Sequence, residues 1–198
     1  LSALDEDITS EDVSTNSVMP CRTEGEVELI CKQDGVLCGI DIAERVFKLL
    51  DDSIVFETKI KDGEKVKKGD IIAEMKGSTK TLLKGERTAL NLLQHLSGIA
   101  SATNRCVEKV KGTRAQITDT RKTLPGLRAL QKYAVTVGGG KNHRFNLSDG
   151  AMLKDNHIDA GGGIPATISK LRSKIGHMVK IEVEVRNLSE LKDAIEAG

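Results

Sequence analysis

The sequence contains no tryptophan, one tyrosine and three phenylalanines among 198 residues. Proteins that bind single-stranded nucleic acid stack bases on aromatic side chains, and this chain lacks the residues for such a platform. Lysine and arginine total 30 against 29 acidic residues, so the net charge of +1 exerts no general attraction on nucleic acid. We therefore expect no nucleic-acid partner, and a core built from leucine, isoleucine, valine and alanine.

Long apolar stretches are also missing. No run reaches the roughly 18 apolar residues that a membrane-spanning helix needs. Residues 1–12 are acidic and polar, whereas a secretory signal has a basic stretch followed by an apolar one. We expect no membrane association and a cytoplasmic location.

Motifs of several common sites are absent as well. Cys21, Cys31, Cys38 and Cys106 follow neither a zinc-binding pattern nor a small disulfide framework, so we expect reduced, mostly buried thiols. The sequence has no Walker loop and no Gly-x-Gly-x-x-Gly fingerprint. Any phosphate would therefore be held by side chains, or by loops outside this sequence.

The first half of the chain predicts a mixed α/β domain. Residues 1–20 favour an acidic surface arm, with a short capped helix as the alternative. Alternating and helical patterns then predict strands at 26–30, 35–39, 54–60 and 66–77, and a helix at 42–50. The turn Lys61-Asp62-Gly63 separates two of these strands, which indicates an antiparallel arrangement.

Residues 54–77 also resemble the hammerhead barrel of biotinyl carrier domains. In those domains a lysine beside methionine on a hairpin accepts the cofactor, which makes Lys76 a candidate. The second flanking methionine is missing, and residues 77–80 favour a loop. We expect a structural, hammerhead-like motif without an attached cofactor.

A long helix is predicted at 86–110, with Gly85 at its start and Gly98 as a close-packing point. The second half of the chain then alternates between strand and helix. Strands are expected at 115–119, 150–153 and 180–185, and helices at 126–135, 164–175 and 188–197. This order is typical of parallel βα units, so we predict a first domain at 1–111 and a second at 112–198.

Cationic side chains gather where the predicted strands end, the functional side of βα units. They are Arg121, Lys122, Lys141, His143, Arg144, Lys154 and His157. Arginine suits bidentate capture of carboxylates or phosphates, and Arg121 with Arg144 would fit a dicarboxylate. The pattern predicts a pocket for a strongly anionic small molecule.

Two carboxylates share one face of the strand at 180–185. Glu182 and Glu184 are two residues apart, so both point to the same side. Glu184 lies nearer the strand's C-terminal end and is the better functional candidate, with Glu182 in a supporting role. An exposed edge strand with a plain polar face is the alternative.

Three motifs carry a family resemblance. They are Thr-Arg-Lys-Thr-Leu-Pro-Gly-Leu-Arg at 120–128, Lys-Asn-His-Arg-Phe-Asn-Leu-Ser-Asp at 141–149, and Leu-Lys-Asp-Asn-His at 153–157. With Gly-Glu-Arg-Thr-Ala-Leu at 85–90 and Glu-Val-Glu-Val at 182–185, the chain resembles the quinolinate phosphoribosyltransferase family. The resemblance implies an α/β fold, with an N-terminal α/β sandwich, a C-terminal open α/β barrel, and a dimer completing each active site.

The resemblance also assigns roles by motif position. Quinolinate carboxylates would bind to Arg121, His143, Arg144 and Lys154, with Arg87 reaching in from the other subunit. Thr120 would join the substrate site. Lys122 would contact phosphoribosyl pyrophosphate, and Glu184 its ribose hydroxyls or bound magnesium, with Lys122 and Glu184 as the catalytic residues.

The implied reaction transfers phosphoribose to quinolinate with release of pyrophosphate and carbon dioxide, and it yields nicotinate mononucleotide for NAD biosynthesis. One alternative is a related phosphoribosyltransferase acting on another aromatic acid, and another is the carrier module built on Lys76. The family's barrel continues beyond three βα units, so we expect this chain to hold only its first part. We do not expect these 198 residues alone to be active.

Overall fold

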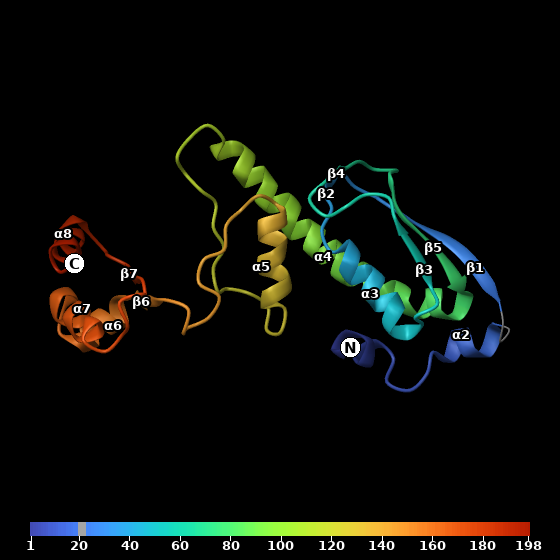
Figure 1. Cartoon of the computed structure of the whole chain (residues 1–198), viewed down its shortest axis with the longest axis horizontal. Helices are drawn as coiled ribbons and strands as arrows, with labels where there is room; N and C mark the ends of the chain where they lie inside the picture. Colours follow the sequence, from blue (N-terminus) through green and yellow to red (C-terminus); the bar gives the residue numbers. More distant parts are fainter. Residues whose placement is uncertain (20–22) are drawn as a thin grey trace. The chain divides into compact units, whose positions relative to one another are not determined.

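The computed structural model describes residues 1–19 and 23–198, so Cys21 lies outside the described residues. The chain divides into two compact units, Leu1–Asn142 and His143–Gly198 (Figure 1). Both units contain helices and strands, which confirms the α/β class. The domain boundary near residue 112 stays a prediction, because a division by contacts does not test it.

The main sheet of the first unit has three antiparallel strands in the order β1-β5-β3. Two more short strands, β2 and β4, pair separately. The strands are β1 (Glu24–Ile30), β2 (Gly35–Val36), β3 (Val55–Thr58), β4 (Lys65–Val66) and β5 (Ile71–Ser78). The antiparallel strands predicted from alternation are confirmed, because an apolar inner face and a charged outer face require a period of two.

Two helices cover the inner face of this sheet. They are α3 (Ile40–Leu50) and the long α4 (Thr79–Val110). Phe47 of α3, Met75 of β5 and Leu82 of α4 are buried in one core cluster. The loop predicted at 77–80 is wrong, because β5 runs directly into α4.

The packing of α3 against α4 depends on Gly85. A Cβ atom at this position would lie 2.6 Å and 2.7 Å from two ring atoms of Phe47. Gly98, predicted as the close-packing point, would have nothing within 4 Å of its Cβ. The helix therefore starts before Gly85 and uses Gly85, not Gly98, for close contact.

Substituting alanine at these two glycines should have opposite effects. Gly85→Ala is expected to lower the free energy of unfolding by about 1–3 kcal/mol, because the added methyl overpacks the Phe47 ring. Gly98→Ala should raise it by about 0.5–1 kcal/mol, because alanine favours a helix interior and meets open space. Urea denaturation followed by circular dichroism measures both, and equal effects would contradict the packing described.

The acidic arm predicted at the N-terminus is wrong, and the alternative of a short capped helix is right. Residues 1–19 contain α1 (Ser2–Asp7) and α2 (Val13–Val18). Asp12 caps α2 by accepting a hydrogen bond from Thr15 N at 2.9 Å. Leu4 is buried in the main core, so this segment is anchored by apolar contact.

The first unit ends with α5 (Arg128–Val137), which packs on α4. The strand predicted at 115–119 is reduced to one parallel bridge between Thr118 and Lys141. A small second core joins Val36, Leu96 and Ala134. Gly138 lies so close to α4 that a Cβ would be 2.4 Å from the Ala100 carbonyl oxygen.

The second unit contains a parallel pair of strands. Its elements are β6 (Ala151–Leu153), α6 (Asp155–Gly161), α7 (Ile164–Arg172), β7 (Ile181–Val183) and α8 (Leu188–Glu196). β6 and β7 pair in parallel, with Met152 opposite Glu182. Leu153, Ile158 and Ile168 form its core. The predicted βα connection is confirmed here, and it also contains the short helix α6, which was not predicted.

Cysteine burial departs from expectation. Cys38 is buried, but Cys31 is half-buried and Cys106 exposed. Burial, and then the charge of Asp62, raise the pKa of the Cys38 thiol to about 12.

None of the helices in the part of the chain that the structure describes has the length and apolar character of a membrane span.

These environments predict selective alkylation. Cys106 should react with iodoacetamide in the folded protein, whereas Cys38 should react only after unfolding, because its thiol is both buried and protonated. Peptide mass mapping measures each site. The raised pKa of Cys38 also makes the free energy of unfolding depend on pH. This contribution is fully present below the ordinary thiol pKa of about 8.5, and it is lost as the pH rises toward the pKa of Cys38 in the folded protein. Rapid labelling of Cys38 at neutral pH would contradict its placement.

Candidate active site

The Arg121 loop, residues 120–123, follows the Thr118 bridge and precedes α5. Thr120 and Lys122 are exposed, and Lys122 N donates to Thr120 Oγ1 at 3.0 Å. Arg121 is half-buried, and its buried Nε has no hydrogen-bond partner among the described residues. A buried guanidinium nitrogen without an acceptor is costly, which marks Arg121 as a site for an anionic ligand.

Side chains of α5 hold this loop. Lys132 Nζ lies 2.6 Å from Asp119 Oδ1, just before the loop. Arg128 Nε donates to Thr123 Oγ1 at 3.1 Å, and Leu124 N donates to Gln131 Oε1 at 3.0 Å. The loop is therefore fixed at both ends while Arg121 and Lys122 lie between them.

Arg87 lies on α4, in the first unit, with its side chain exposed. Lys141 is exposed as well, and its backbone N donates to Ile117 O at 2.8 Å. The exposure of Arg87 leaves its guanidinium accessible to another molecule. Its predicted role across a subunit interface stays a prediction.

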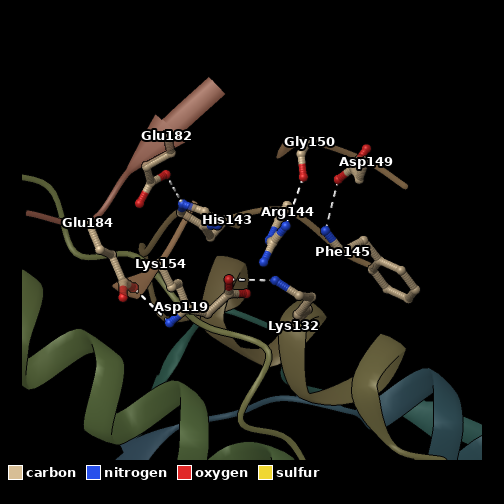
Figure 2. A network of polar contacts seen from close by, with 10 residues as sticks. All are labelled: Asp119, Lys132, His143, Arg144, Phe145, Asp149, Gly150, Lys154, Glu182 and Glu184. Carbon is tan, nitrogen blue, oxygen red and sulfur yellow. Dashed lines mark hydrogen bonds and ion pairs between the residues drawn. The ribbon is translucent and has the colours of Figure 1, made fainter. Parts of the chain in front are cut away.

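In the second unit, the β6-β7 pair has one polar and one apolar face. Leu153 and Val183 pack into the core, so Met152, Lys154, Glu182 and Glu184 lie on the opposite face. Lys154 Nζ is 2.7 Å from Glu184 Oε1, and His143 Nε2 is 2.6 Å from Glu182 Oε2 (Figure 2). The polar face thus pairs His143 with Glu182 and Lys154 with Glu184.

Arg144 and His157 have local partners. Arg144 Nη1 donates to the Gly150 carbonyl oxygen at 2.8 Å (Figure 2), so one guanidinium nitrogen stabilises the segment before β6. His157 Nδ1 accepts a hydrogen bond from Lys154 N at 3.0 Å. This bond caps the first turn of α6 and engages Nδ1 of the ring, and the place of His157 in the cationic pocket stays a prediction.

The predicted site residues fall in both units. Arg87, Thr120, Arg121 and Lys122 belong to the first, and His143, Arg144, Lys154 and Glu184 to the second. A single cavity shared by both groups stays a prediction.

Glu182 and Glu184 are the carboxylates that could meet a metal ion. In the described part of the chain no group of three or more His, Cys, Asp or Glu side chains could hold one. One or two carboxylates suffice for magnesium when substrate phosphates and water supply its other ligands. The residues present therefore fit magnesium bound together with a pyrophosphate, and not a dedicated metal cage.

Lys76 has no carrier-type environment. It lies within β5, the central strand of the sheet, opposite Glu26 and Val55. Its Nζ pairs with Glu26 Oε1 at 2.6 Å, which raises the pKa of Lys76. A cofactor-bearing lysine needs a protruding hairpin turn, so this geometry argues against the carrier alternative.

The residues that anchor the Arg121 loop were missed from the sequence. Asp119 looked like the end of a strand, and Lys132 and Gln131 like polar positions of a helix. The one sequence feature that could have indicated their role is that Asp119 lies two positions before Arg121. Pattern alone does not show that a lysine in mid-helix turns inward to a carboxylate.

The chain is similar to known proteins over nearly its whole length. Residues 12–97 match the family described as quinolinate phosphoribosyl transferase, N-terminal domain, and residues 99–198 match its C-terminal domain. The crystal structure of NadC from Streptococcus pyogenes is 47% identical, with a TM-score of 0.94, over 98% of this chain and 70% of that one.

Two curated relatives are similar over nearly all of this chain. A probable nicotinate-nucleotide pyrophosphorylase (carboxylating) of Bacillus subtilis (strain 168) is 46% identical over 193 residues, 98% of this chain and 66% of the relative. A protein of the same name from Synechocystis (strain PCC 6803) is 42% identical over 192 residues, 97% of this chain and 65% of the relative. The chain thus spans just under two thirds of these relatives. The match to the C-terminal domain of the family alone covers more than half of this chain. The chain therefore belongs to the quinolinate phosphoribosyl transferase family.

Proposed function

We propose that the protein transfers phosphoribose from phosphoribosyl pyrophosphate to quinolinate, with decarboxylation, giving nicotinate mononucleotide, pyrophosphate and carbon dioxide. The observation that carries the proposal is Arg121, a half-buried guanidinium whose Nε has no partner among the described residues, on a loop fixed at both ends. Family membership makes a pyridine dicarboxylate the anion of choice. The relatives named nicotinate-nucleotide pyrophosphorylase support the same reaction.

In the proposed mechanism the basic side chains orient the acceptor. Arg121, His143, Arg144 and Lys154 bind the two carboxylates, so that the pyridine nitrogen faces the anomeric carbon. Lys154 already contacts Glu184 through one N–H, and an ammonium has three donors, so it can bind a carboxylate as well. Holding both reactants in this geometry supplies much of the rate enhancement.

The chemistry needs no covalent enzyme intermediate. The nitrogen lone pair forms the new C–N bond, and the C–O bond to pyrophosphate breaks with its electron pair leaving on oxygen. Glu184 stabilises the cationic anomeric centre, and Lys122 binds the phosphates. The 2-carboxylate then leaves as carbon dioxide, and the electron pair left on the ring takes up a proton.

Magnesium is proposed as the metal, held by pyrophosphate oxygens together with Glu184. Bound there, it would neutralise charge on the departing pyrophosphate. Removing divalent ions with EDTA should abolish pyrophosphate release, and added magnesium should restore it. Full activity in EDTA would refute the metal requirement.

The central test is a pyrophosphate-release assay on the protein expressed from its complete reading frame. Release should require both quinolinate and phosphoribosyl pyrophosphate, and nicotinate mononucleotide should appear by mass spectrometry. Nicotinate or another monocarboxylate should not replace quinolinate, because one of the carboxylate contacts would be unused. Release with a different aromatic acid alone would support the related phosphoribosyltransferase instead.

We also propose a homodimer in which Arg87 enters the partner's site, and a cytoplasmic location. Mixing and exchanging subunits of two inactive variants, Arg87→Ala and Arg121→Ala, should restore about one quarter of the activity, because half of the dimers would carry one intact site. No recovery would place Arg87 in its own subunit's site. Cell fractionation with an antibody tests the location.

A further inference from the structure

The buried ion pair of Asp119 and Lys132, together with the exposed Asn142 that binds it, forms a polar cluster in the first unit, here called the Asp119 node. The Lys132 and Asp119 side chains are 2% and 7% exposed, and their charged atoms lie 2.6 Å apart (Figure 2). In the amide orientation that satisfies its hydrogen bonds, Asn142 donates to Asp119 Oδ2 at 2.7 Å and to the Lys132 carbonyl oxygen at 3.0 Å. Both carboxylate oxygens of Asp119 are therefore engaged.

A buried ion pair is a weak source of stability. Taking two charges out of water costs about as much as their attraction returns, and apolar replacements of similar volume are often as stable. What the pair does provide is a defined geometry, because either charge left alone in the interior would be costly. The function of the Asp119 node must therefore be inferred from its position in the structure.

The Asp119 node lies where two cationic motifs begin. Asp119 directly precedes residues 120–122, and Asn142 directly precedes His143. The two backbone segments are joined there, since Asp119 N donates to Lys141 O at 3.1 Å and Lys141 N donates to Ile117 O at 2.8 Å. Lys132 thus fixes the backbone one residue before each motif.

The far end of the Arg121 loop is held by α5, the helix that carries Lys132. Gln131 and Arg128, on the same helix as Lys132, bind Leu124 N and Thr123 Oγ1. Gln131 Nε2 also lies 2.8 Å from His95 Nε2 on α4, so α5 is braced against the longest helix. A short loop held at both ends has few conformations to lose when an anion binds.

We propose that Lys132 is a positioning residue: through Asp119 it holds Arg121 and Lys122 in the orientation that binds the anionic substrates. The inference rests on the proposed function, and it extends that function to residues that touch no substrate. Asn142 completes the arrangement by orienting the second carboxylate oxygen of Asp119.

The test compares Lys132→Met, Asn142→Ala and a charge-matched control, Lys111→Met, in the full-length protein. Lys111 is exposed and pairs with its neighbour Glu108 at 3.4 Å. The KM for quinolinate should rise by about 10- to 100-fold in Lys132→Met and by a smaller factor in Asn142→Ala, since misplacing a contact by about 1 Å has effects of this size. Lys132→Arg should recover part of the loss, and Lys111→Met should stay within about twofold.

A merely structural role would give a different result. It would lower the melting temperature and the fraction of active protein, and therefore kcat, with KM unchanged, which would overturn the proposal. If Lys132→Met does not fold, Asn142→Ala decides, because its side chain is exposed and its loss leaves the ion pair in place.

Hydrogen exchange separates this inference from the proposed function. Amide protection of Lys122 and Leu124 should fall in the variants while amides in the middle of α4 keep theirs. If the parent protein releases no pyrophosphate, the proposed function fails, yet the exchange result still shows whether the node orders the loop. Unchanged exchange at both amides would overturn the positioning role in either case.

Discussion

Replacing Arg121 with lysine is expected to lower kcat/KM for quinolinate by about 30- to 1000-fold, because two charge-assisted hydrogen bonds of about 1–2 kcal/mol each would be lost. Lysine keeps the charge but cannot present two parallel N–H groups to a carboxylate. The side chain is half-buried and its Nε has no partner in the described structure, so its loss should leave folding largely unaffected. Steady-state kinetics at saturating phosphoribosyl pyrophosphate measure the effect.

Arg114→Lys is the matched control for this change. Arg114 is exposed and lies on the same connecting segment, before the Thr118 bridge. Its replacement should change kcat/KM by less than about twofold. Equal losses in both variants would mean that general charge, and not the bidentate geometry of Arg121, binds the substrate.

Replacing Asp62 with alanine is expected to destabilise the first unit by about 2–4 kcal/mol, because several hydrogen bonds to one carboxylate would be lost together. Asp62 accepts from Gly39 N at 2.8 Å and Ile40 N at 3.0 Å, at the start of α3, and from Tyr133 Oη at 2.7 Å. The two backbone donors would lose a charged partner at a partly buried position. Urea denaturation measures the loss.

Asp62 both caps α3 and binds Tyr133 on α5, and Tyr133→Phe separates these two functions. It removes only the hydrogen bond to α5, so it should cost about 1 kcal/mol, well below the cost of Asp62→Ala. Burial and the hydrogen bond to Asp62 raise the pKa of Tyr133, so at neutral pH its hydroxyl is a donor. If both variants lose the same stability, the cap on α3 contributes nothing.

Much of the first unit could be predicted because its patterns are regular. The patterns in residues 26–30 and 66–77 predicted β1 and β5, although the second range also contains the end of β4. Helical spacing located α3 and most of α4 for the same reason. The start of α4 was misplaced because a glycine in a helix interior and a glycine at its boundary look alike until a neighbouring ring such as Phe47 is known.

The candidate site was predicted in part. The motifs identified the cations, and the shared face of Glu182 and Glu184 followed from strand periodicity alone. The partners of these residues could not be predicted, because His143 with Glu182 and Lys132 with Asp119 are contacts between positions far apart in sequence. The hydrogen bond from Lys154 N to His157 Nδ1 likewise depends on helix α6, which was not predicted.

Because α4 is one continuous helix, it can transmit a displacement from one end of the first unit to the other. At a rise of about 1.5 Å per residue, the Phe47 contact at Gly85 and the Gly138 contact at Ala100 are roughly 22 Å apart along one rod. A tilt of about 5° at the first contact would move the second by roughly 2 Å, a shift that the close approach of Gly138 to Ala100 could not absorb without moving α5. A substitution on the α3 side of the rod can therefore alter the far side without touching it.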